Sequence, residues 1–363
     1  MKCSLTDKIV KKIYIGPSNI ANLSNHVEKS LRSHGFYADF ITWSYWDHPF
    51  EYEKTKVFRV MNQPPFKLFD KNVFYFFNEY FLKPFYFLFA LIRYDIFLFI
   101  KPATFLRANI DLKILKFFNK KVGIFYVGCP DRDISFDSDP EYICNTCRDK
   151  DKQKSCLCNN INKKIAQAIV FEKYADYIIG PPDTVSYVQD KNKVRNYRYP
   201  MPAIIINGSD KNFNGRLRIS HLPSNPLLKG THIIEPILNK LAEENDIEII
   251  IKKETWAREK VVHDIKNSHI VIDSVVGYVF GTICLEAVQY GCVPLNAYPD
   301  WIAQFYEIPP VVKITGATLH STLQALIDDR VLLKMYAERS QQAYNKYFIY
   351  QSTGKYYKEM LDL

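Results

Sequence analysis

The chain has 363 residues, of which 47% are hydrophobic and 24% charged, and its formal net charge is +9. This length and balance predict a globular protein with two domains. The positive charge suits an anionic membrane, nucleic acid or a phosphorylated substrate, or a basic surface with no special partner. No basic run or aromatic-basic repeat occurs, which argues against sequence-specific nucleic-acid binding.

The beginning of the chain contains short alternating strands and helices. Residues 11–16 form an apolar strand that ends in Gly16, a helix is expected over 19–34, and residues 37–43 form the next strand. Residues 1–12 are polar and basic with no apolar segment behind them, so we expect no signal peptide. These features predict a cytoplasmic protein.

The most apolar stretch is 73–100, and Asn78, Glu79, Lys83, Arg93 and Asp95 interrupt it. A membrane-spanning helix needs about 20 largely uncharged residues. We therefore expect a buried aromatic helix and then a core strand over 94–100. The alternative is that part of its apolar face touches a membrane or a lipid-linked substrate, which would place the protein at the inner face of a membrane.

A loop at 128–160 contains the closely spaced cysteines Cys144, Cys147, Cys156 and Cys158. In a cytosolic chain such a cluster favours a metal over disulfides, and free thiols are the other alternative. A closed four-thiolate zinc site would be structural and would not take part in catalysis.

A second series of strands and helices follows a polar segment at 190–216. We place the domain boundary at 207/208 and expect strands near 217–221, 247–253, 269–273 and 292–297. Helices are expected at 229–244, 255–267, 281–290, 317–328 and 330–346. Repeated βαβ units predict an α/β fold with a doubly wound parallel sheet in each half.

Polar and glycine residues follow two strands of this second half. The first strand ends in His221, Ser224 and Asn225 follow it, and Lys229 precedes a glycine and a helix. Another strand ends at Asp273, and a turn with Gly281 and Thr282 then opens a helix that carries Glu286. Backbone amides at a helix N-terminus, a lysine and a carboxylate are what a nucleotide diphosphate requires.

Each of these residues also has a purely structural interpretation. Lys229 could be a surface lysine, Glu286 an exposed helix residue, and His221 a buried histidine whose bonds are all internal. Lys253, at the end of a strand, suits either a nucleotide base or a solvated strand end.

These motifs resemble the GT-B glycosyltransferases, and most closely the retaining family-4-like enzymes that build bacterial surface polysaccharides. The resemblance is carried by SHLPSNPLLKGTHII, by SHIVIDSVVGYVFGTICLEAVQYGCVP, and by the stretch from YDIFLFI to GCPDR. It implies two Rossmann-like domains that face each other across a cleft. The expected domains are an acceptor domain at 1–207, a nucleotide-sugar domain at 208–345, and a C-terminal helix at 346–363 that packs back on the first domain.

The resemblance also implies roles for particular residues. Glu286 matches the carboxylate that binds the ribose, Gly281 and Thr282 match the helix end beside the diphosphate, and Lys229 matches the lysine that contacts the phosphates. Gly16 matches the N-terminal glycine loop. The family often has a second glutamate where this chain has Tyr278, and Asp273 could then supply a nearby carboxylate to the sugar.

Asp131 and Arg132 follow the strand expected at 121–127, where ligands of open α/β sheets bind. Asp131 could orient or deprotonate an acceptor hydroxyl and Arg132 could hold a phosphate, or both could form a surface turn.

The expected activity is transfer of a sugar from a UDP- or GDP-type donor to a glycan or lipid-linked acceptor. Retention is favoured, no cofactor is required for catalysis, and Asp131 as a true general base would instead allow inversion. The alternatives are a GT-B-fold sugar-nucleotide epimerase or phosphorylase, a nucleic-acid-binding or base-modifying protein, and an inactive binding subunit.

Overall fold

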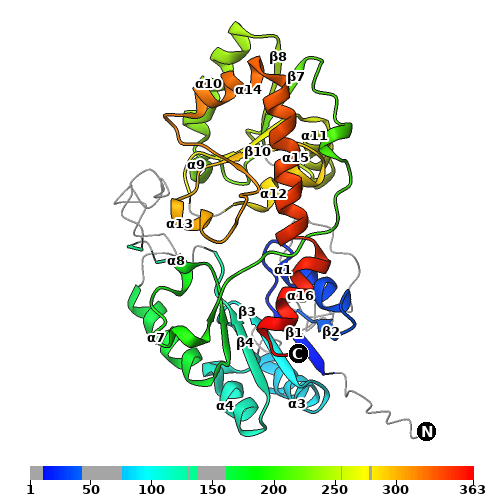
Figure 1. Ribbon diagram of the computed structural model, residues 1–363. Helices are drawn as coiled ribbons and strands as arrows, with labels where there is room; N and C mark the ends of the chain where they lie inside the picture. Colours follow the sequence, from blue (N-terminus) through cyan, green and yellow to red (C-terminus); the bar gives the residue numbers. More distant parts are fainter. Residues whose placement is uncertain are drawn as a thin grey trace, which may run out of the picture. The chain divides into compact units, whose positions relative to one another are not determined.

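The structure is a computed structural model that describes residues 11–42, 76–128, 131–133, 135–136, 161–254, 256–277 and 280–363. Its contacts divide the chain into two compact units (Figure 1). Unit 1 comprises Met1–Arg132, Ile161–Pro200 and Thr353–Leu363, and unit 2 comprises Asp133–Asn160 and Met201–Ser352. No helix among the described residues is long and apolar enough to cross a bilayer.

Unit 1 contains a six-stranded sheet in the order β2-β1-β3-β4-β5-β6, and every neighbouring pair is parallel. The strands are β1 (Lys12–Pro17), β2 (Tyr37–Phe40), β3 (Ile96–Ile100), β4 (Lys121–Phe125), β5 (Tyr177–Ile179) and β6 (Val194–Arg195). All five residues of β3 are buried, as expected for a strand covered on both faces of a parallel sheet.

The helices of unit 1 connect these strands (Figure 1). They are α1 (Leu23–Arg32), the π-helical turn η1 (Asn78–Leu82), α3 (Lys83–Arg93), η2 (Arg107–Asn109), α4 (Ile110–Phe117), α7 (Ile161–Tyr174), α8 (Pro182–Val185) and η5 (Lys191–Lys193). Their inner faces pack an aromatic core, in which Tyr14, Phe97, Phe99 and Phe105 are fully buried and in mutual ring contact. The apolar run at 94–100 therefore supplies the core strand predicted from the sequence.

The prediction that the aromatic helix is buried is only half right. One face of α3 joins the core through Phe87, Ala90 and Leu91, whereas Phe85 and Ile92 are 74% and 86% exposed. A helix that is apolar all round gives no sequence signal for which face points inward.

Unit 2 contains a five-stranded sheet in the order β11-β10-β9-β7-β8, which is again parallel throughout. Its strands are β7 (Leu217–His221), β8 (Ile247–Ile251), β9 (Ile270–Ser274), β10 (Val293–Asn296) and β11 (Val312–Lys313). Its helices are η6 (Gly208–Asp210), α9 (Pro226–Lys229), α10 (Thr231–Glu244), α11 (Arg258–Asn267), α12 (Thr282–Gln289), α13 (Asp300–Ala303), α14 (Leu319–Asp328) and α15 (Arg330–Tyr347).

The residues before the boundary that we predicted at 207/208 are bonded into unit 2. The N–H groups of Ile205 and Ile206 donate to the carbonyl of Gln289, and the Tyr344 hydroxyl donates to the carbonyl of Pro202 at 2.7 Å. The contacts therefore divide the chain after Pro200.

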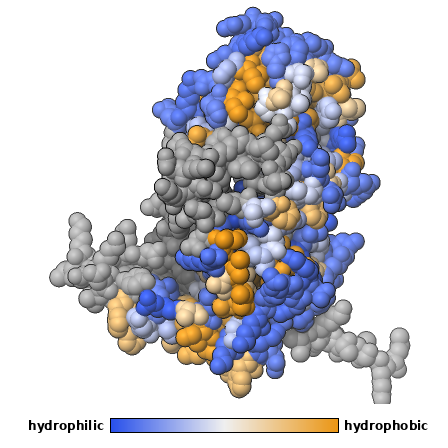
Figure 2. All heavy atoms as spheres, turned by 90° about the vertical axis from the view of Figure 1, so that its left-hand side faces the viewer, coloured by the Kyte–Doolittle hydropathy of each residue, from blue (hydrophilic) through white to orange (hydrophobic). Residues whose placement is uncertain are grey.

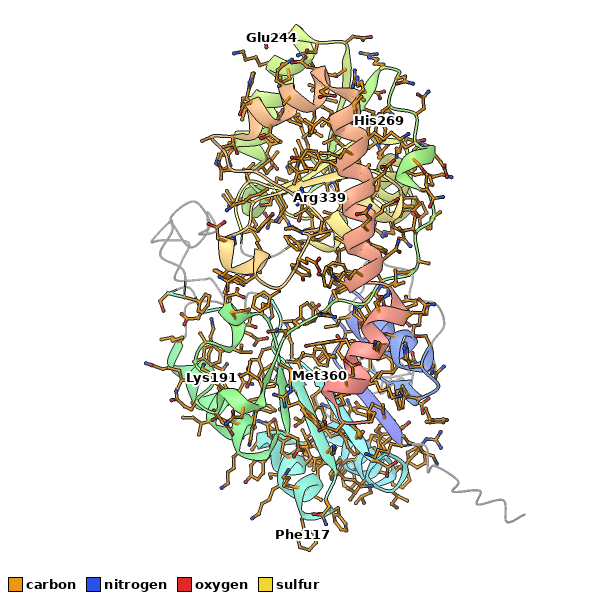
Figure 3. The ribbon with its side chains drawn as sticks, in the orientation of Figure 1. Phe117, Lys191, Glu244, His269, Arg339 and Met360 are labelled. Atoms are coloured by element: carbon orange, nitrogen blue, oxygen red, sulfur yellow. The ribbon has the colours of Figure 1, made fainter. Side chains whose placement is uncertain are left out.

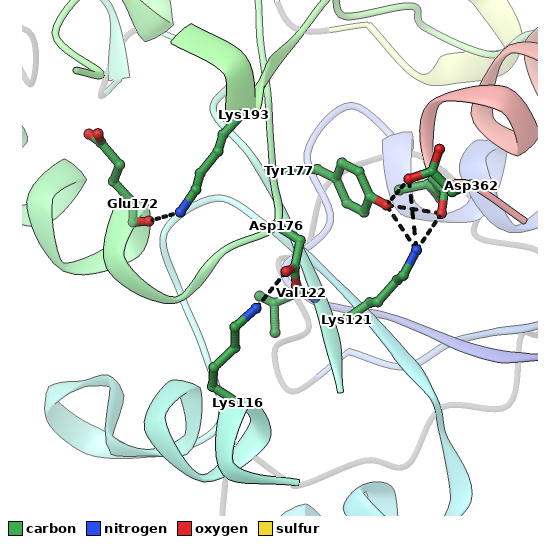
Figure 4. Close-up of polar contacts among 9 residues, drawn as sticks. Lys116, Lys121, Val122, Glu172, Asp176, Tyr177, Lys193 and Asp362 are labelled. Atoms are coloured by element: carbon green, nitrogen blue, oxygen red, sulfur yellow. Dashed lines mark hydrogen bonds and ion pairs between the residues drawn. The ribbon is translucent and has the colours of Figure 1, made fainter. Parts of the chain in front are cut away.

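The last helix, α16 (Tyr350–Met360), continues into unit 1. There Tyr357 is fully buried against Phe125, and its hydroxyl donates to the carbonyl of Arg198 at 2.5 Å. Figure 4 shows the end of the chain beside β4 and β5, where the Tyr177 hydroxyl donates to Asp362 at 2.8 Å. Residues 353–363 are thus an integral part of unit 1.

Candidate functional site

Each sheet has a switch point, between two adjacent strands whose next strands in the chain lie on opposite sides of the pair. In unit 2 this point lies between β7 and β9, because β7 leads to β8 on one side and β9 leads to β10 on the other. Ligands of open α/β sheets bind outside the carboxyl ends of the strands at such a point. β7 ends at His221 and β9 ends at Ser274, so the residues just after them form the candidate site.

Lys229 and Asp273 form a close ion pair at this position. The Lys229 ammonium lies 2.7 Å from Asp273 Oδ1, and the backbone N–H of Gly281 donates to Asp273 Oδ2 at 3.0 Å. The Lys229 side chain is 25% exposed and the Asp273 side chain 1%. The buried carboxylate therefore fixes the lysine and the N-terminus of α12 together, while part of the lysine faces solvent.

Gly281 is required here by space rather than by backbone conformation. Its φ of −69° suits any residue, but a Cβ would lie 2.1 Å from Asp273 Oδ2 and 3.1 Å from Lys229 Nζ. Only glycine leaves room for the carboxylate and the ammonium against the first turn of α12. The N–H of Cys284 donates to the carbonyl of Gly281 at 3.0 Å, and the N–H groups of Thr282 and Ile283 come before it at the start of the helix. A helix N-terminus of this kind is favourable for an anion.

Asp273 was predicted to contact the sugar of the donor. In the structure its two oxygens accept hydrogen bonds from Lys229 and from the backbone N–H of Gly281. The Cys284 thiol bonds to the same carboxylate, and burial raises the pKa of that thiol well above its ordinary value. In the structure Asp273 is therefore a partner of Lys229 and of the backbone of Gly281.

His221 is fully buried at the end of β7. Its Nδ1 lies 2.9 Å from the carbonyl of Ile272, and its Nε2 lies 2.8 Å from the hydroxyl of Thr231. A carbonyl can only accept, so Nδ1 carries the proton and Nε2 accepts from Thr231. Burial lowers the pKa of His221, and this neutral ring joins β7, β9 and α10 instead of offering a proton to a phosphate.

The remaining residues of the first loop are at the surface. Ser224 and Asn225 are exposed, and the Asn225 side chain accepts from the N–H of Leu228 at 3.1 Å as the cap of α9. Lys253 pairs with Glu235 of α10 at 2.6 Å and is 68% exposed. These geometries suit structural roles for Asn225 and Lys253.

Glu286 is held by an arginine that sequence reasoning missed. The Arg258 guanidinium donates to both carboxylate oxygens of Glu286, at 2.9 and 2.6 Å. Such a two-point pair fixes the orientation of the carboxylate. Arg258 begins α11, the helix that follows β8, and the rule that ligand contacts follow strand ends could have indicated it. Thr282 is half-buried as the first residue of α12.

A second group of charges follows β4 in unit 1. Asp131 is buried, it accepts from the N–H of Val127 at 2.9 Å, and burial raises its pKa to about 6. Arg132 donates to the fully buried Asp183 at 2.7 Å, and Lys164 of α7 donates to the carbonyl of Arg132. The surface turn that was the alternative interpretation is not what the structure shows, because these charges form a partly buried cluster.

Gly16 lies at the carboxyl end of β1 with a φ of 152°. A Cβ there would lie 2.1 Å from the carbonyl of Ile41, so the close approach of β1 to the end of β2 requires glycine.

Five predicted site residues lie outside the described residues: Tyr278, Cys144, Cys147, Cys156 and Cys158. Among the residues that the structure describes, no group of three or more His, Cys, Asp or Glu side chains could hold a metal ion. Cys284 and Cys292 are buried free thiols.

No protein-family model and no curated protein sequence matches this chain. Solved structures match it over nearly its whole length. HepE from Anabaena, solved with UDP-glucose, has a TM-score of 0.57 at 11% identity, with 97% of this chain and 99% of that chain covered. Sucrose-phosphate synthase from Thermosynechococcus elongatus has a TM-score of 0.59 at 10% identity and the same coverage. The catalytic domain of starch synthase IV from Arabidopsis thaliana, bound to ADP and acarbose, has a TM-score of 0.59 at 12% identity, again with 97% and 99% covered.

These similarities identify the fold. The chain has the GT-B fold, an α/β architecture with two Rossmann-like parallel-sheet domains, as the sequence predicted. Because all three identities are low, the similarity by itself assigns the fold and leaves the activity to be argued from the site.

Proposed function

We propose that this chain is a glycosyltransferase that moves a sugar from a nucleotide-diphosphate sugar to a hydroxyl of a glycan or lipid-linked glycan. The observation that carries the proposal is the arrangement of Lys229, Asp273 and Gly281 at the switch point of unit 2. It brings a partly exposed ammonium and the N-terminus of a helix to one place. Both favour negative charge.

In the proposed reaction the bond between the anomeric carbon of the sugar and the β-phosphate oxygen breaks. A bond from the same carbon to the acceptor oxygen forms, and the proton of the acceptor hydroxyl passes to the leaving diphosphate. Lys229 and the first turn of α12 stabilise the negative charge that develops on the diphosphate. Transfer of the proton to the leaving group is consistent with retention, as in the family-4-like enzymes of surface-polysaccharide synthesis.

Asp273 contributes through Lys229 in this proposal. A lysine on a short helix has many rotamers, and a buried carboxylate 2.7 Å away holds its ammonium at one position before the donor arrives. Glu286 would accept from the ribose hydroxyls of the nucleotide, with Arg258 keeping its carboxylate oriented. Asp131 would orient or deprotonate the acceptor hydroxyl, and Arg132 would hold a phosphate.

A UDP-type donor is the first candidate to test. HepE was solved with UDP-glucose, whereas the similar starch synthase was bound to ADP. The charge arrangement described above recognises a diphosphate and does not distinguish the bases, so the base must be found by experiment.

The first experiment is a thermal-shift panel with UDP, GDP and ADP and their common sugars, on the wild-type chain and on Lys229→Met. A shift of several degrees with one nucleotide series, lost in Lys229→Met, is the expected result. Lys240→Met is the matched control, because Lys240 lies on α10 with 60% exposure and pairs only loosely with Glu244, at 3.8 Å. If no nucleotide shifts the melting temperature of the wild type, the proposal is wrong.

Once a donor is found, the anomeric configuration of the product is read by NMR. Retention is expected, and an inverted product would assign Asp131 as a general base instead. Structural zinc at Cys144, Cys147, Cys156 and Cys158 is a separate proposal, and about one zinc ion per purified chain, lost when the first two cysteines become serine, would support it.

A further inference from the structure

The surface of α3 is unusual for a helix at the outside of a protein. Between 81 and 92, every exposed position is a large apolar residue, and the set is Phe81, Phe85, Leu88, Phe89 and Ile92. Their spacing places them on one face, and the opposite face lies in the core of unit 1. We call these five residues the apolar face of α3.

This face is larger than ordinary surface exposure explains. Single exposed apolar side chains are common, but a continuous patch on a soluble protein marks a surface that binds something. The two charged residues of α3, Lys83 and Arg93, are half-buried and do not interrupt this face. Lys83 bonds to Glu79, whereas Arg93 contacts Tyr37 and lies 3.6 Å from Asp39.

The neighbouring α4 adds further apolar side chains together with positive charge. The Arg107 guanidinium donates to the Tyr80 hydroxyl at 2.7 Å, which joins η2, the turn before α4, to η1. Phe117 is 80% exposed and points away from the end of α4 (Figure 3), and Phe118 beside it is 53% exposed. The same surface carries the exposed Lys113 and Lys116, of which Lys116 is paired with Asp176 (Figure 4).

The acidic residues of this region offset part of that charge. Asp111 is buried and bonds to Thr104 and to the N–H of Phe105. Glu79 bonds to Lys83, and Asp95 accepts from the backbone N–H of Lys12 at 2.9 Å. Lys116 is offset by Asp176, and the exposed Asp95 lies 3.9 Å from Lys120. The exposed Lys113 and Arg107 therefore supply the positive charge beside the apolar residues, which complements an anionic partner.

Further apolar residues reach the surface of unit 1 on α7, where Ile165, Ile169 and Val170 are exposed together with the hydrophilic Lys163 and Lys173. Figure 2, viewed from the left-hand side of Figure 1, shows such apolar atoms scattered among hydrophilic ones. This mixture differs from the unbroken apolar face of α3, so we do not group α7 with that face.

We propose that the apolar face of α3, with Phe117, Phe118 and Lys113 of the α4 region, docks on an anionic lipid bilayer. α3 has 11 residues, about 16 Å of helix, which is too short to cross the apolar core but suits a helix lying in the interface. A second copy of the chain paired about a twofold axis would bring the same cationic residues against each other. Nucleic acid would satisfy the lysines but would leave Leu88 and Ile92 without an apolar partner.

This inference deepens the proposed function in one respect. A lipid-linked acceptor lies at a bilayer surface, and an enzyme docked there meets its acceptor at high local concentration. That link rests on the proposed glycosyltransferase activity, whereas the docking surface itself does not.

The test is flotation of the whole chain with vesicles of phosphatidylcholine alone, or with about 30% phosphatidylglycerol, at low and high salt. The wild type is expected to float with the anionic vesicles, and more weakly as salt rises. Phe85→Ser combined with Ile92→Ser removes the two most exposed side chains of the face and should lower the partition coefficient at least about tenfold.

The matched control is Val331→Ser combined with Met335→Ser, which removes two exposed apolar residues of α15 in unit 2 and should float like the wild type. Both double variants should keep the wild-type melting temperature. The proposal is overturned if the wild type fails to float, if the α3 variant floats equally well, or if light scattering shows a dimer that only the α3 variant dissociates. Nucleotide-induced thermal shifts should be unchanged in the α3 variant, so a failure of the docking surface is distinguishable from a failure of the proposed activity.

Discussion

Replacement of Gly281 by alanine tests the anion site most directly. The backbone at Gly281, with φ −69° and ψ 157°, is open to alanine, so the substitution introduces no conformational strain. The added methyl group would instead lie 2.1 Å from Asp273 Oδ2 and 2.9 Å from its carboxyl carbon. Either the carboxylate or the N-terminus of α12 must therefore move.

The size of the effect follows from what that movement breaks. An overpacked site costs about 1–3 kcal/mol of unfolding free energy, and a disturbed buried ion pair costs more. We expect a loss of about 2–4 kcal/mol, which lowers the melting temperature of a unit of this size by roughly 4–12 °C. The nucleotide-induced thermal shift should also disappear, because Lys229 loses the partner that positions it.

Two further variants separate this explanation from a general sensitivity to alanine. A methyl group added at Gly215 would meet no atom within 4 Å, so Gly215→Ala should leave stability within about 1 kcal/mol of the wild type. Asp273→Ala makes room for the methyl group, so the Gly281→Ala, Asp273→Ala double variant should lose less stability than the sum of the two single variants. Additive losses, or a Gly281→Ala chain that melts and binds like the wild type, would refute the reasoning.

Three other predictions concern stability. Arg258→Ala leaves the Glu286 carboxylate without its partner and should cost about 1–3 kcal/mol in urea denaturation, and Arg258→Lys should restore only part because one ammonium cannot make both bonds. The pKa of Asp131 is raised to about 6, so the folded state holds a proton that the unfolded state releases near pH 4, and stability falls as pH rises from 4 to 6. Asp131→Asn should therefore gain stability relative to the wild type between pH 4.5 and 7.5, by about 2 kcal/mol in comparative denaturation; an unchanged difference would show that Asp131 ionises normally. Gly354→Ala would place a methyl group 2.4 Å from the carbonyl of Ser30 and should lower the melting temperature of unit 1 by several degrees, with Gly215→Ala again as control.

The rule that strand ends meet at one edge of a parallel sheet was enough to predict the neighbourhood of the site. Lys229 ends the short helix after β7, whereas Asp273 lies in β9 and Gly281 follows it, and β7 and β9 are adjacent in the sheet. What each side chain does there depends on burial, which a strand-end position does not specify. The full burial of Asp273 and His221 makes them structural partners of Lys229 and Thr231.

Sequence reasoning missed the role of Arg258 and gave an exposed face of the aromatic helix only as an alternative, and both have one cause. The position of Arg258 after a strand end marks only its neighbourhood, and its role depends on a carboxylate 28 residues later in the chain. The sequence does not reveal the exposure of Phe85 and Ile92, because both faces of α3 are apolar. The hydrophobic pattern then does not indicate which face points to solvent. Pair geometry and solvent exposure are properties of the assembled fold.

The return of the chain into unit 1 has a consequence for synthesis. A ribosome completes Met201–Ser352 before it adds Tyr357, the buried residue that packs on Phe125 and bonds to the carbonyl of Arg198. The part of unit 1 that is made first therefore lacks Tyr357, which covers part of its aromatic core, until most of unit 2 has been synthesised. Nascent chains that stop at 352 should consequently be held by chaperones or degraded, although every residue of the candidate site has already been made.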